Sequence, residues 1–229
     1  MSPEEQTVTS QAEEYLEAIY RLETKEGYAR TMDISRSLNV VPGSVTNTIE
    51  NLERKGLVTH EPYRGVKLTD EGRKIASMIL RRHRLAERLL TDFLHLDWSE
   101  VHDPACKLEH AFSAEIIKAL EKALGNPKKC PHGNPIPTTC GSVFEEETVA
   151  LTELEPKTGG VIVKITEEQT ETLQQLSKLC LLPGQTVVVE SKNGASGPYT
   201  VRVGNKTCTL DHAVASIIYV KPDQTEVHM

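Results

Sequence analysis

The sequence predicts an α+β protein made of several small domains. A pattern of two short helices, a turn and a β-hairpin stands near the start, and helical periodicity then continues to about residue 124. Beyond residue 143 the apolar period changes from helical to two, which is typical of strands. Because 229 residues exceed a typical domain of ~150, we expect two or three small domains. The pattern of elements places three, at 1–72, 73–143 and 144–229.

The first helix is expected at residues 9–25, where apolar side chains recur at helical spacing. Ser10 is the expected N-cap, and Glu13 three residues later would complete a capping box. Residues 31–38 form the next expected helix, and a turn at 39–43 follows it.

A second short helix is expected at residues 43–55, ended by Gly56 in the position after the last helical residue. Two strands of a hairpin follow at 57–59 and 66–69, with Arg64 near the tip. This order of elements is that of a winged helix–turn–helix, whose second helix enters the major groove of DNA.

A polar face on that second helix and the arginines around it are the candidate DNA contacts. Short polar side chains there can reach base edges or phosphates. Residues 29–90 carry twelve basic and seven acidic side chains, net +5, although the whole chain is at -7. The candidate residues are Arg30, Arg36, Ser44, Thr46, Asn47, Asn51 and Arg64. Use of the winged helix for protein contact alone is the alternative.

Longer helices are expected next, at residues 70–93 and at about 98–124. Pro104 requires either a kink or a new helix that begins with Asp103 as N-cap. Residues 126–143 are rich in proline and are expected to form a linker.

The last domain is expected to be a small, partly open β-barrel. Its predicted strands are EETVALTEL, GGVIVKI, QTVVVES, YTVRVG and SIIYV, and one helix at about 167–178 interrupts them.

A cluster of metal-ligand side chains stands out on the longer helices. His83 and Glu87 are four residues apart, and His102, Cys106, Glu109 and His110 also share one helical face. Burying such groups without partners is costly, and a divalent cation would satisfy them together. Nitrogen, oxygen and sulfur donors suit Fe(II), Co(II), Ni(II) or Zn(II), with Mn(II) as an alternative.

The stretches HRLAERLLTDFL, VHDPACKLEH and GNPIP, behind a winged helix, resemble the iron-dependent repressors of the diphtheria toxin repressor family. The resemblance covers about residues 10–138, and the barrel resembles the SH3-like (FeoA-like) domain of that family more loosely. It implies a transcriptional repressor, not an enzyme. Metal would activate it to bind double-stranded operator DNA as a homodimer, with two dimers on one operator as a further arrangement.

The resemblance also implies two neighbouring metal sites. Cys106, Glu109 and His110 match ligands of the primary site, and the first helix would add Glu14. The ancillary site would contain His83, Glu87 and His102. The barrel would lend it Glu167, with Gln169 as a weaker candidate.

The expected metal is Fe(II), because a thiolate at Cys106 favours iron over manganese. Iron-type members have Met where this chain has Glu14, and manganese-type members have Asp there and a Glu at the place of Glu17. Manganese-type members, however, have Glu at the place of Cys106, so the chain combines features of both types.

The remaining cysteines are Cys130, Cys140, Cys180 and Cys208, which we expect to be structural; Cys130 and His132 lack a second pair that would complete a zinc site. The odd number of scattered cysteines favours reduced thiols and a cytoplasmic location. No apolar run of membrane-spanning length and no secretory signal is evident.

Three other functions are also compatible with the sequence. A dinuclear metalloenzyme could use the same ligands to activate water. A winged-helix regulator could respond to a small organic ligand, or the barrel could bind a proline-rich peptide, including the GNPIP segment itself.

Overall fold

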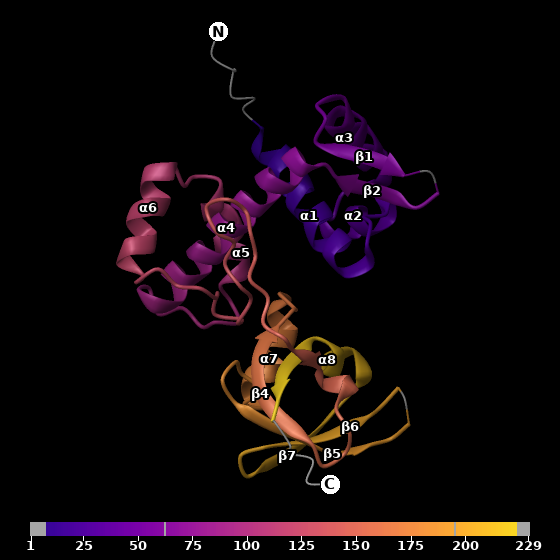
Figure 1. Cartoon of the computed structure of the whole chain (residues 1–229), viewed down its shortest axis with the longest axis vertical. Coiled ribbons are helices and arrows are strands. Elements are labelled where there is room, and N and C mark those ends of the chain that lie inside the picture. The colour runs from indigo at the N-terminus through magenta and orange to yellow at the C-terminus, as the bar shows by residue number, and fades with distance from the viewer. Residues whose placement is uncertain (1–7, 62, 195, 224–229) are drawn as a thin grey trace. The chain divides into compact units, whose positions relative to one another are not determined.

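The computed structural model of the chain describes residues 8–61, 63–194 and 196–223, and Figure 1 shows its helices and strands. Two compact units are present. The first comprises residues up to His83 together with Pro137–Val143, and the second comprises Arg84–Ile136 and the chain from Phe144 onward. The acidic start, residues 1–7, lies outside the described residues.

The first unit begins with three helices, α1 (Ser10–Glu26), α2 (Thr31–Ser37) and α3 (Pro42–Arg54). Thr9, rather than the expected Ser10, caps α1, because its hydroxyl accepts a hydrogen bond from the Ala12 N–H. Pro42 occupies the first turn of α3, where the absent N–H has no intrahelical partner to lose.

The hairpin of the wing consists of β1 (Val58–Glu61) and β2 (Gly65–Leu68), paired antiparallel. Buried aliphatic side chains of α1, α2, α3 and the hairpin form one core, which includes Leu16, Ile34, Ile49 and Val66. The predicted winged helix–turn–helix is therefore the fold of this unit, with each element within a few residues of its predicted bounds.

Helix α4 (Asp70–Asp92) is continuous through the boundary between the two units, as the sequence predicted. The single helix expected at 98–124 is instead two helices, α5 (His102–Glu109) and α6 (Ala114–Ala123). Ser113 is the N-cap of α6, because its hydroxyl accepts a hydrogen bond from the Ile116 N–H. This cap begins a new helix after α5.

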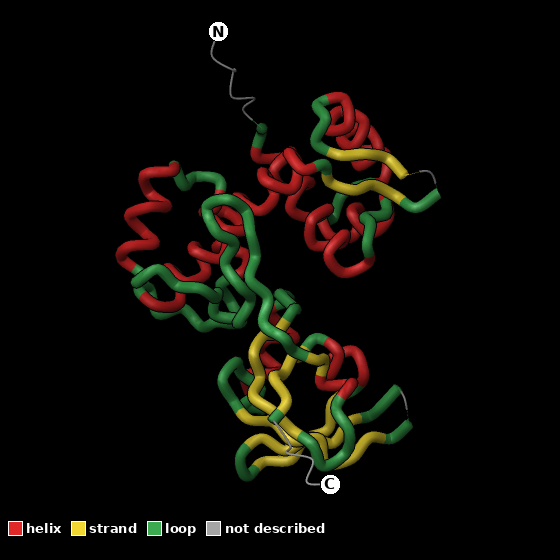
Figure 2. The backbone as a smooth tube through the Cα atoms, viewed as in Figure 1, coloured by secondary structure: helices red, strands yellow, loops and turns green. Residues whose placement is uncertain are grey.

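The second unit also contains a curled six-stranded sheet, shown in yellow in Figure 2. Its strand order is β3-β8-β4-β5-β6-β7, and all neighbours are antiparallel. The strands are β3 (Val149–Ala150), β4 (Gly159–Ile165), β5 (Thr186–Lys192), β6 (Tyr199–Val203), β7 (Lys206–Leu210) and β8 (Ile218–Pro222). Bulges in β4 and β5 bend the sheet toward a barrel.

Parts of this domain differ from the sequence prediction. The segment EETVALTEL forms only the short β3 and a 3₁₀ turn at Leu151–Glu153. Strand β7 and helix α8 (His212–Ser216) were not predicted, whereas helix α7 (Thr170–Lys178) begins three residues after its predicted start.

The proline-rich segment expected to be a linker is folded in its middle part. Lys129 and Pro135 form an antiparallel bridge, and the Cys130 N–H donates to the Asn134 carbonyl over 2.9 Å. The turn pairs with β4, because the Ile165 N–H donates to the His132 carbonyl and the Asn134 amide donates to the Ile165 carbonyl, both over 2.9 Å.

Gly133 allows this close approach to β4. Its φ is +85°, and a Cβ at this position would lie 2.0 Å from the Val163 carbonyl oxygen. Any side chain therefore requires the backbone to shift as well as to adopt a left-handed conformation.

We predict that Gly133→Ala destabilises the second unit by more than the roughly 1–2 kcal/mol that a left-handed non-glycine residue costs. Gly125→Ala is the matched control, because Gly125 also has a positive φ of +74° but no atom within 4 Å of its ideal Cβ. Urea unfolding followed by the fluorescence of Trp98 would compare the two variants. Equal destabilisation would show that the contact with Val163 does not constrain this turn.

Candidate metal centre

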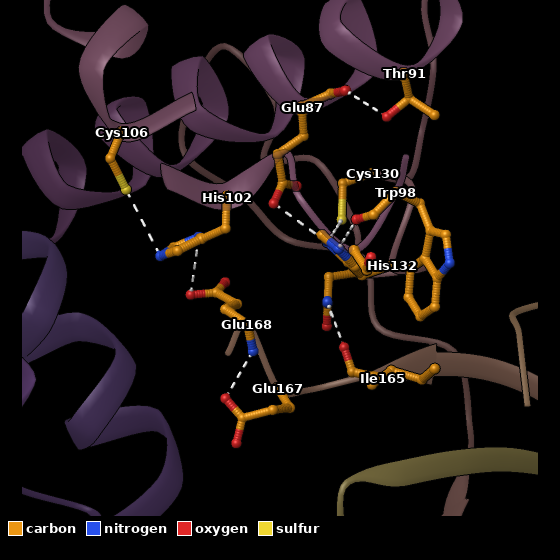
Figure 3. A network of polar contacts seen from close by, with 12 residues as sticks. Glu87, Thr91, Trp98, His102, Cys106, Cys130, His132, Ile165, Glu167 and Glu168 are labelled. Atoms are coloured by element: carbon orange, nitrogen blue, oxygen red, sulfur yellow. Dashed lines mark hydrogen bonds and ion pairs between the residues drawn. The ribbon is translucent and has the colours of Figure 1, made fainter. Parts of the chain in front are cut away.

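A buried cluster in the second unit combines three different ligand types. Glu87 on α4, Cys130 and His132 each offer one ligand atom, and these atoms lie within 4.8 Å of one another. All three residues are at most 4% exposed. Figure 3 shows the Glu87 carboxylate and the Cys130 sulfur directed at the His132 ring.

The orientation of the His132 ring is fixed from both sides. Nε2–H donates to the Trp98 carbonyl oxygen over 2.8 Å, while Nδ1 lies 3.2 Å from Glu87 Oε1 and 3.9 Å from Cys130 Sγ. The indole of Trp98 also packs against the imidazole, with ring centroids 5.3 Å apart. A histidine that donates one N–H to a backbone carbonyl presents its other nitrogen in the manner of a metal ligand.

The pKa of His132 reflects these opposing surroundings. Burial lowers the pKa, but hydrogen bonding to Cys130 and Glu87 and the charges of those groups raise it to about 10 from the ordinary 6.5. Without a cation, the imidazolium thus balances the buried acidic groups.

A divalent transition metal fits this donor set. Carboxylate oxygen, thiolate sulfur and imidazole nitrogen together are ligands for a borderline ion such as Fe(II) or Zn(II). The backbone carbonyl behind the imidazole supplies the outer support that such sites commonly have. A bound ion would replace the proton on Nδ1 as the positive charge of the cluster.

The second unit contains another set of expected ligands on and next to α5. His102 Nε2 lies 3.6 Å from Cys106 Sγ, one helical turn away. Nδ1 of the same ring lies 3.4 Å from Glu168 Oε2. Glu109 is buried, and its Oε1 lies 3.4 Å from His110 Nε2.

The expected barrel ligand, Glu167, contacts the backbone of its own segment. Its Oε1 accepts hydrogen bonds from the backbone N–H groups of Glu168 and Gln169, over 2.7 and 3.0 Å. Glu168, which the sequence analysis did not name, is the residue that contacts His102 (Figure 3).

In the first unit, Glu17 rather than Glu14 is placed beside His83. Glu17 and His83 are both buried and offer ligand atoms within 4.8 Å of one another, whereas Glu14 is exposed. Glu17 Oε1 also lies 2.6 Å from Arg21 Nη2.

The expected DNA-contacting residues lie on the exposed surface of the first unit. Ser44, Thr46, Asn47 and Asn51 are exposed along α3, although the Thr46 hydroxyl already donates to the Pro42 carbonyl. Arg30, Arg36 and Arg64 are also exposed, and Arg36 lies 3.3 Å from Asp33 and Arg64 4.0 Å from Glu61.

Two further side chains extend this surface and were missed in the sequence. Tyr63, at the end of the wing, is fully exposed, and Tyr28 accepts a hydrogen bond from Arg30 Nη2 over 2.9 Å. A tyrosine next to Arg64, at the tip of a predicted hairpin, was the available signal for the first of them.

Comparison with protein-family models matches almost the whole chain. Residues 7–66 match the iron dependent repressor N-terminal DNA binding domain, and residues 69–138 match the iron dependent repressor metal binding and dimerisation domain. Residues 149–222 match the FeoA domain. The iron-dependent repressor IdeR of Mycobacterium tuberculosis is 34% identical over 223 residues, which cover 91% of this chain and 96% of that protein.

The chain belongs to the iron-dependent repressor family, to which the diphtheria toxin repressor also belongs. The diphtheria toxin repressor of Corynebacterium diphtheriae is 42% identical over 125 residues, 55% of either chain. This iron-dependent repressor family member is thus a metal-dependent transcriptional repressor that binds DNA and dimerises, and it is not an enzyme.

Solved structures of iron- and manganese-dependent repressors have the same fold. IdeR of T. acidophilum superposes with a TM-score of 0.81 at 33% identity, covering 95% of this chain and all of that chain. A manganese-dependent transcriptional repressor in complex with manganese gives a TM-score of 0.84 at 28% identity, covering 92% of this chain and 99% of that chain.

Among the described residues, no helix has the length and apolar character needed to cross a membrane.

We predict that metal binding to this family member strengthens with pH, because a cation must displace the proton on His132 Nδ1. The direction of this pH dependence follows from the raised pKa of His132. The stabilisation that protonated His132 gives the metal-free fold is complete below pH about 6.5, and it is lost as pH rises through about 10.

Each proton displaced changes the affinity about tenfold per pH unit within that window. Zn(II) titrations followed by Trp98 fluorescence between pH about 6.5 and 8.5 would measure the slope. The slope gives the number of protons that each metal ion displaces. This number should fall by one in His132→Ala and stay unchanged in His60→Ala, because His60 is an exposed residue of the wing. An identical slope in all three proteins would contradict the assignment.

Proposed function

We propose that this repressor senses Fe(II) in the cytoplasm and then binds an operator in metal-homeostasis genes as a dimer. The observation that carries the proposal is the buried Glu87–Cys130–His132 cluster, whose donor atoms lie within 4.8 Å of one another. Two dimers on one operator are part of the proposal. We also propose three domains, for DNA binding at 1–72, for metal binding and dimerisation at 73–143, and an SH3-like domain at 144–229.

Two thiol-containing ligand sets support iron over manganese. Cys130 stands with Glu87 and His132, and Cys106 stands with His102. Soft sulfur donors favour Fe(II) and Zn(II) over Mn(II), which prefers oxygen. The carboxylates in the ligand set reduce this preference, so Mn(II) response is the alternative outcome of the metal titration below.

The proposed metal ligands extend beyond the buried cluster. They belong to the first unit at Glu14, Glu17 and His83, and to the second unit at Glu87, His102, Cys106, Glu109, His110, Cys130, His132 and Glu167. A bound divalent ion would supply the positive charge that keeps thiol and imidazole donors deprotonated and compensates the carboxylates. Cys106 and Glu109 would hold the ion through sulfur and oxygen, and Trp98 packs against His132, which is itself shielded from water.

Metal binding is coupled to DNA binding because some of the proposed ligands belong to the DNA-binding unit. Glu14 and Glu17 lie on α1, whose buried face packs in the same core as the recognition helix α3. Engaging those carboxylates therefore changes the free energy of the DNA-binding unit itself. A ligand shifts such an equilibrium only by its differential affinity for the two states. A change from 1% to 99% of the DNA-competent state requires about 5.5 kcal/mol.

We predict that Fe(II) increases affinity for operator DNA, and that Cys106→Ala or His110→Ala removes the increase without unfolding the protein. Operator sequences selected in vitro with the metal-loaded protein would provide the duplex. Anaerobic titrations with Fe(II), with Mn(II) and without metal would measure the affinity, and circular dichroism would check the fold. Equal affinity with and without metal would end the proposal, and a full Fe(II) response in both variants would end the ligand assignment.

We also predict that contacts from α3 and from the wing act differently on DNA. Asn47→Ala should cost about 1–3 kcal/mol and relax the preference at one base position, because this side chain can contact a base edge. Arg64→Ala should weaken binding to all sequences and lower the salt dependence by about one phosphate contact. Competition between selected and scrambled duplexes at several salt concentrations separates the two outcomes. Similar loss of sequence preference in both variants would contradict the assignment.

A further inference from the structure

The outer edge of the wing is completed by a side chain of α1. Strand β2 pairs with β1 on one side, and on its other side the backbone of Val66 exchanges two hydrogen bonds of 2.9 Å with Ala29. Two residues further along the same edge, the Leu68 N–H donates to Glu23 Oε2 over 3.0 Å. The Glu23 carboxylate thus stands where the backbone carbonyl of a third antiparallel strand would stand.

The second oxygen of the same carboxylate is held by α4. Glu23 Oε1 lies 2.6 Å from Nη2 of Arg73, whose guanidinium also lies 6.0 Å from the centre of the Tyr20 ring. The Glu23 side chain is 11% exposed, whereas that of Glu71, in the first turn of α4, is 64% exposed. Because Glu23 contacts β2 and α4 at once, it joins α1 to the base of the hairpin.

The direction of the wing depends on what holds its base. A two-stranded hairpin is only marginally stable by itself, and the buried Leu68 N–H would lose its partner without Glu23. At about 3.3 Å per residue, Arg64 near the tip is about 13 Å of strand away from Leu68. A rotation of roughly 10° at the base would therefore move the tip by about 2 Å, enough to break a hydrogen bond to a phosphate.

We propose that Glu23 is a positioning residue for the wing, which sets the contact of Arg64 with the DNA backbone without touching DNA itself. The inference rests on the proposed function in that Arg64 contacts a phosphate. Charge alone predicts the opposite effect, since removing a carboxylate from a DNA-binding unit should strengthen its attraction to a polyanion. Positioning instead predicts that DNA binding weakens when Glu23 is replaced.

The test compares Glu23→Ala, Glu23→Gln and Glu71→Ala in the full chain, each with and without Arg64→Ala. Glutamine keeps an oxygen for the Leu68 N–H but loses the charge that faces Arg73. Glu71 is the matched control, because it is an exposed carboxylate of the same unit whose ion pair, 3.4 Å from Lys74, lies within α4.

Two measurements are made on these proteins. Affinity for selected and scrambled duplexes is measured at several salt concentrations, with the metal that gives the wild type its tightest binding. Hydrogen exchange of the metal-free proteins, read by NMR without DNA, compares the Leu68 N–H with the Val66 N–H, whose acceptor Ala29 is unchanged.

The expected result in Glu23→Ala is a local loss at the wing. Exchange of the Leu68 N–H accelerates about 10- to 100-fold, as for the loss of a hydrogen bond to a charged group, and that of Val66 does not. All duplexes bind more weakly, and the salt dependence falls by about one phosphate contact. Adding Arg64→Ala then changes the affinity by less than about twofold, whereas independent sites would give the product of the two losses. Glutamine is intermediate, and Glu71→Ala binds DNA at least as tightly as the wild type.

Three results would overturn the proposal: DNA binding in Glu23→Ala as tight as in the wild type, losses that multiply with Arg64→Ala, or equal acceleration of exchange throughout the unit. If alanine unfolds the unit, the same criteria apply to the glutamine variant, which keeps the acceptor for β2. An Arg64→Ala protein that binds DNA like the wild type would instead contradict the role proposed for Arg64, while the exchange of Leu68 still decides whether Glu23 holds the wing.

Discussion

The hydrogen bond from His132 Nε2 to the Trp98 carbonyl is the contact on which the proposed metal site of the second unit depends. It commits one nitrogen of a buried imidazole to the backbone and turns the other toward Glu87 and Cys130. Were the ring free to rotate, the cluster would lose both its ligand geometry and the partner that balances its buried carboxylate. Hydrogen bonds to β4 hold the turn at Cys130–Asn134 in place, so the barrel supports the orientation of the His132 ring.

The distribution of polar groups separates two tasks within one chain. The first unit carries its arginines and short polar side chains on the surface, where a polyanion can reach them. The second unit buries Glu87, Glu109 and His132, and the first unit also buries Glu17 and His83. Such side chains are costly to bury without charge compensation. A net charge of -7 is therefore compatible with DNA binding, because residues 29–90, which include α2, α3 and the hairpin, are net +5.

Much of the fold could be predicted from periodicity, because α1, α3 and α4 each bury one aliphatic stripe. Strand β7, by contrast, has the sequence KTCTL, and only its pairing with β6 specifies it. The break between α5 and α6 depends on a single serine cap that the continuous helical pattern hid.

The proposed metal ligands on the helices could be identified from the spacing of His, Glu and Cys. The role of Cys130 and His132 was not visible, since their third partner, Glu87, is distant in sequence and becomes a neighbour only through folding. Glu168 was missed for a related reason, as three consecutive polar residues, EEQ, give no indication of which one faces α5. Residues brought together by tertiary contacts thus account for most of what the pattern did not reveal.

The continuity of α4 through His83 and Glu87 limits how this chain can change in length. Each residue of an α-helix advances the side-chain direction by about 100°, so a single inserted or deleted residue between these two positions would turn one donor away from its face. Such a change would leave hydrophobicity and helix propensity almost intact while removing a ligand. In a loop such as the one between α6 and Lys129, an added residue does not rotate a helical face. We therefore expect differences in length among related chains to lie in such loops.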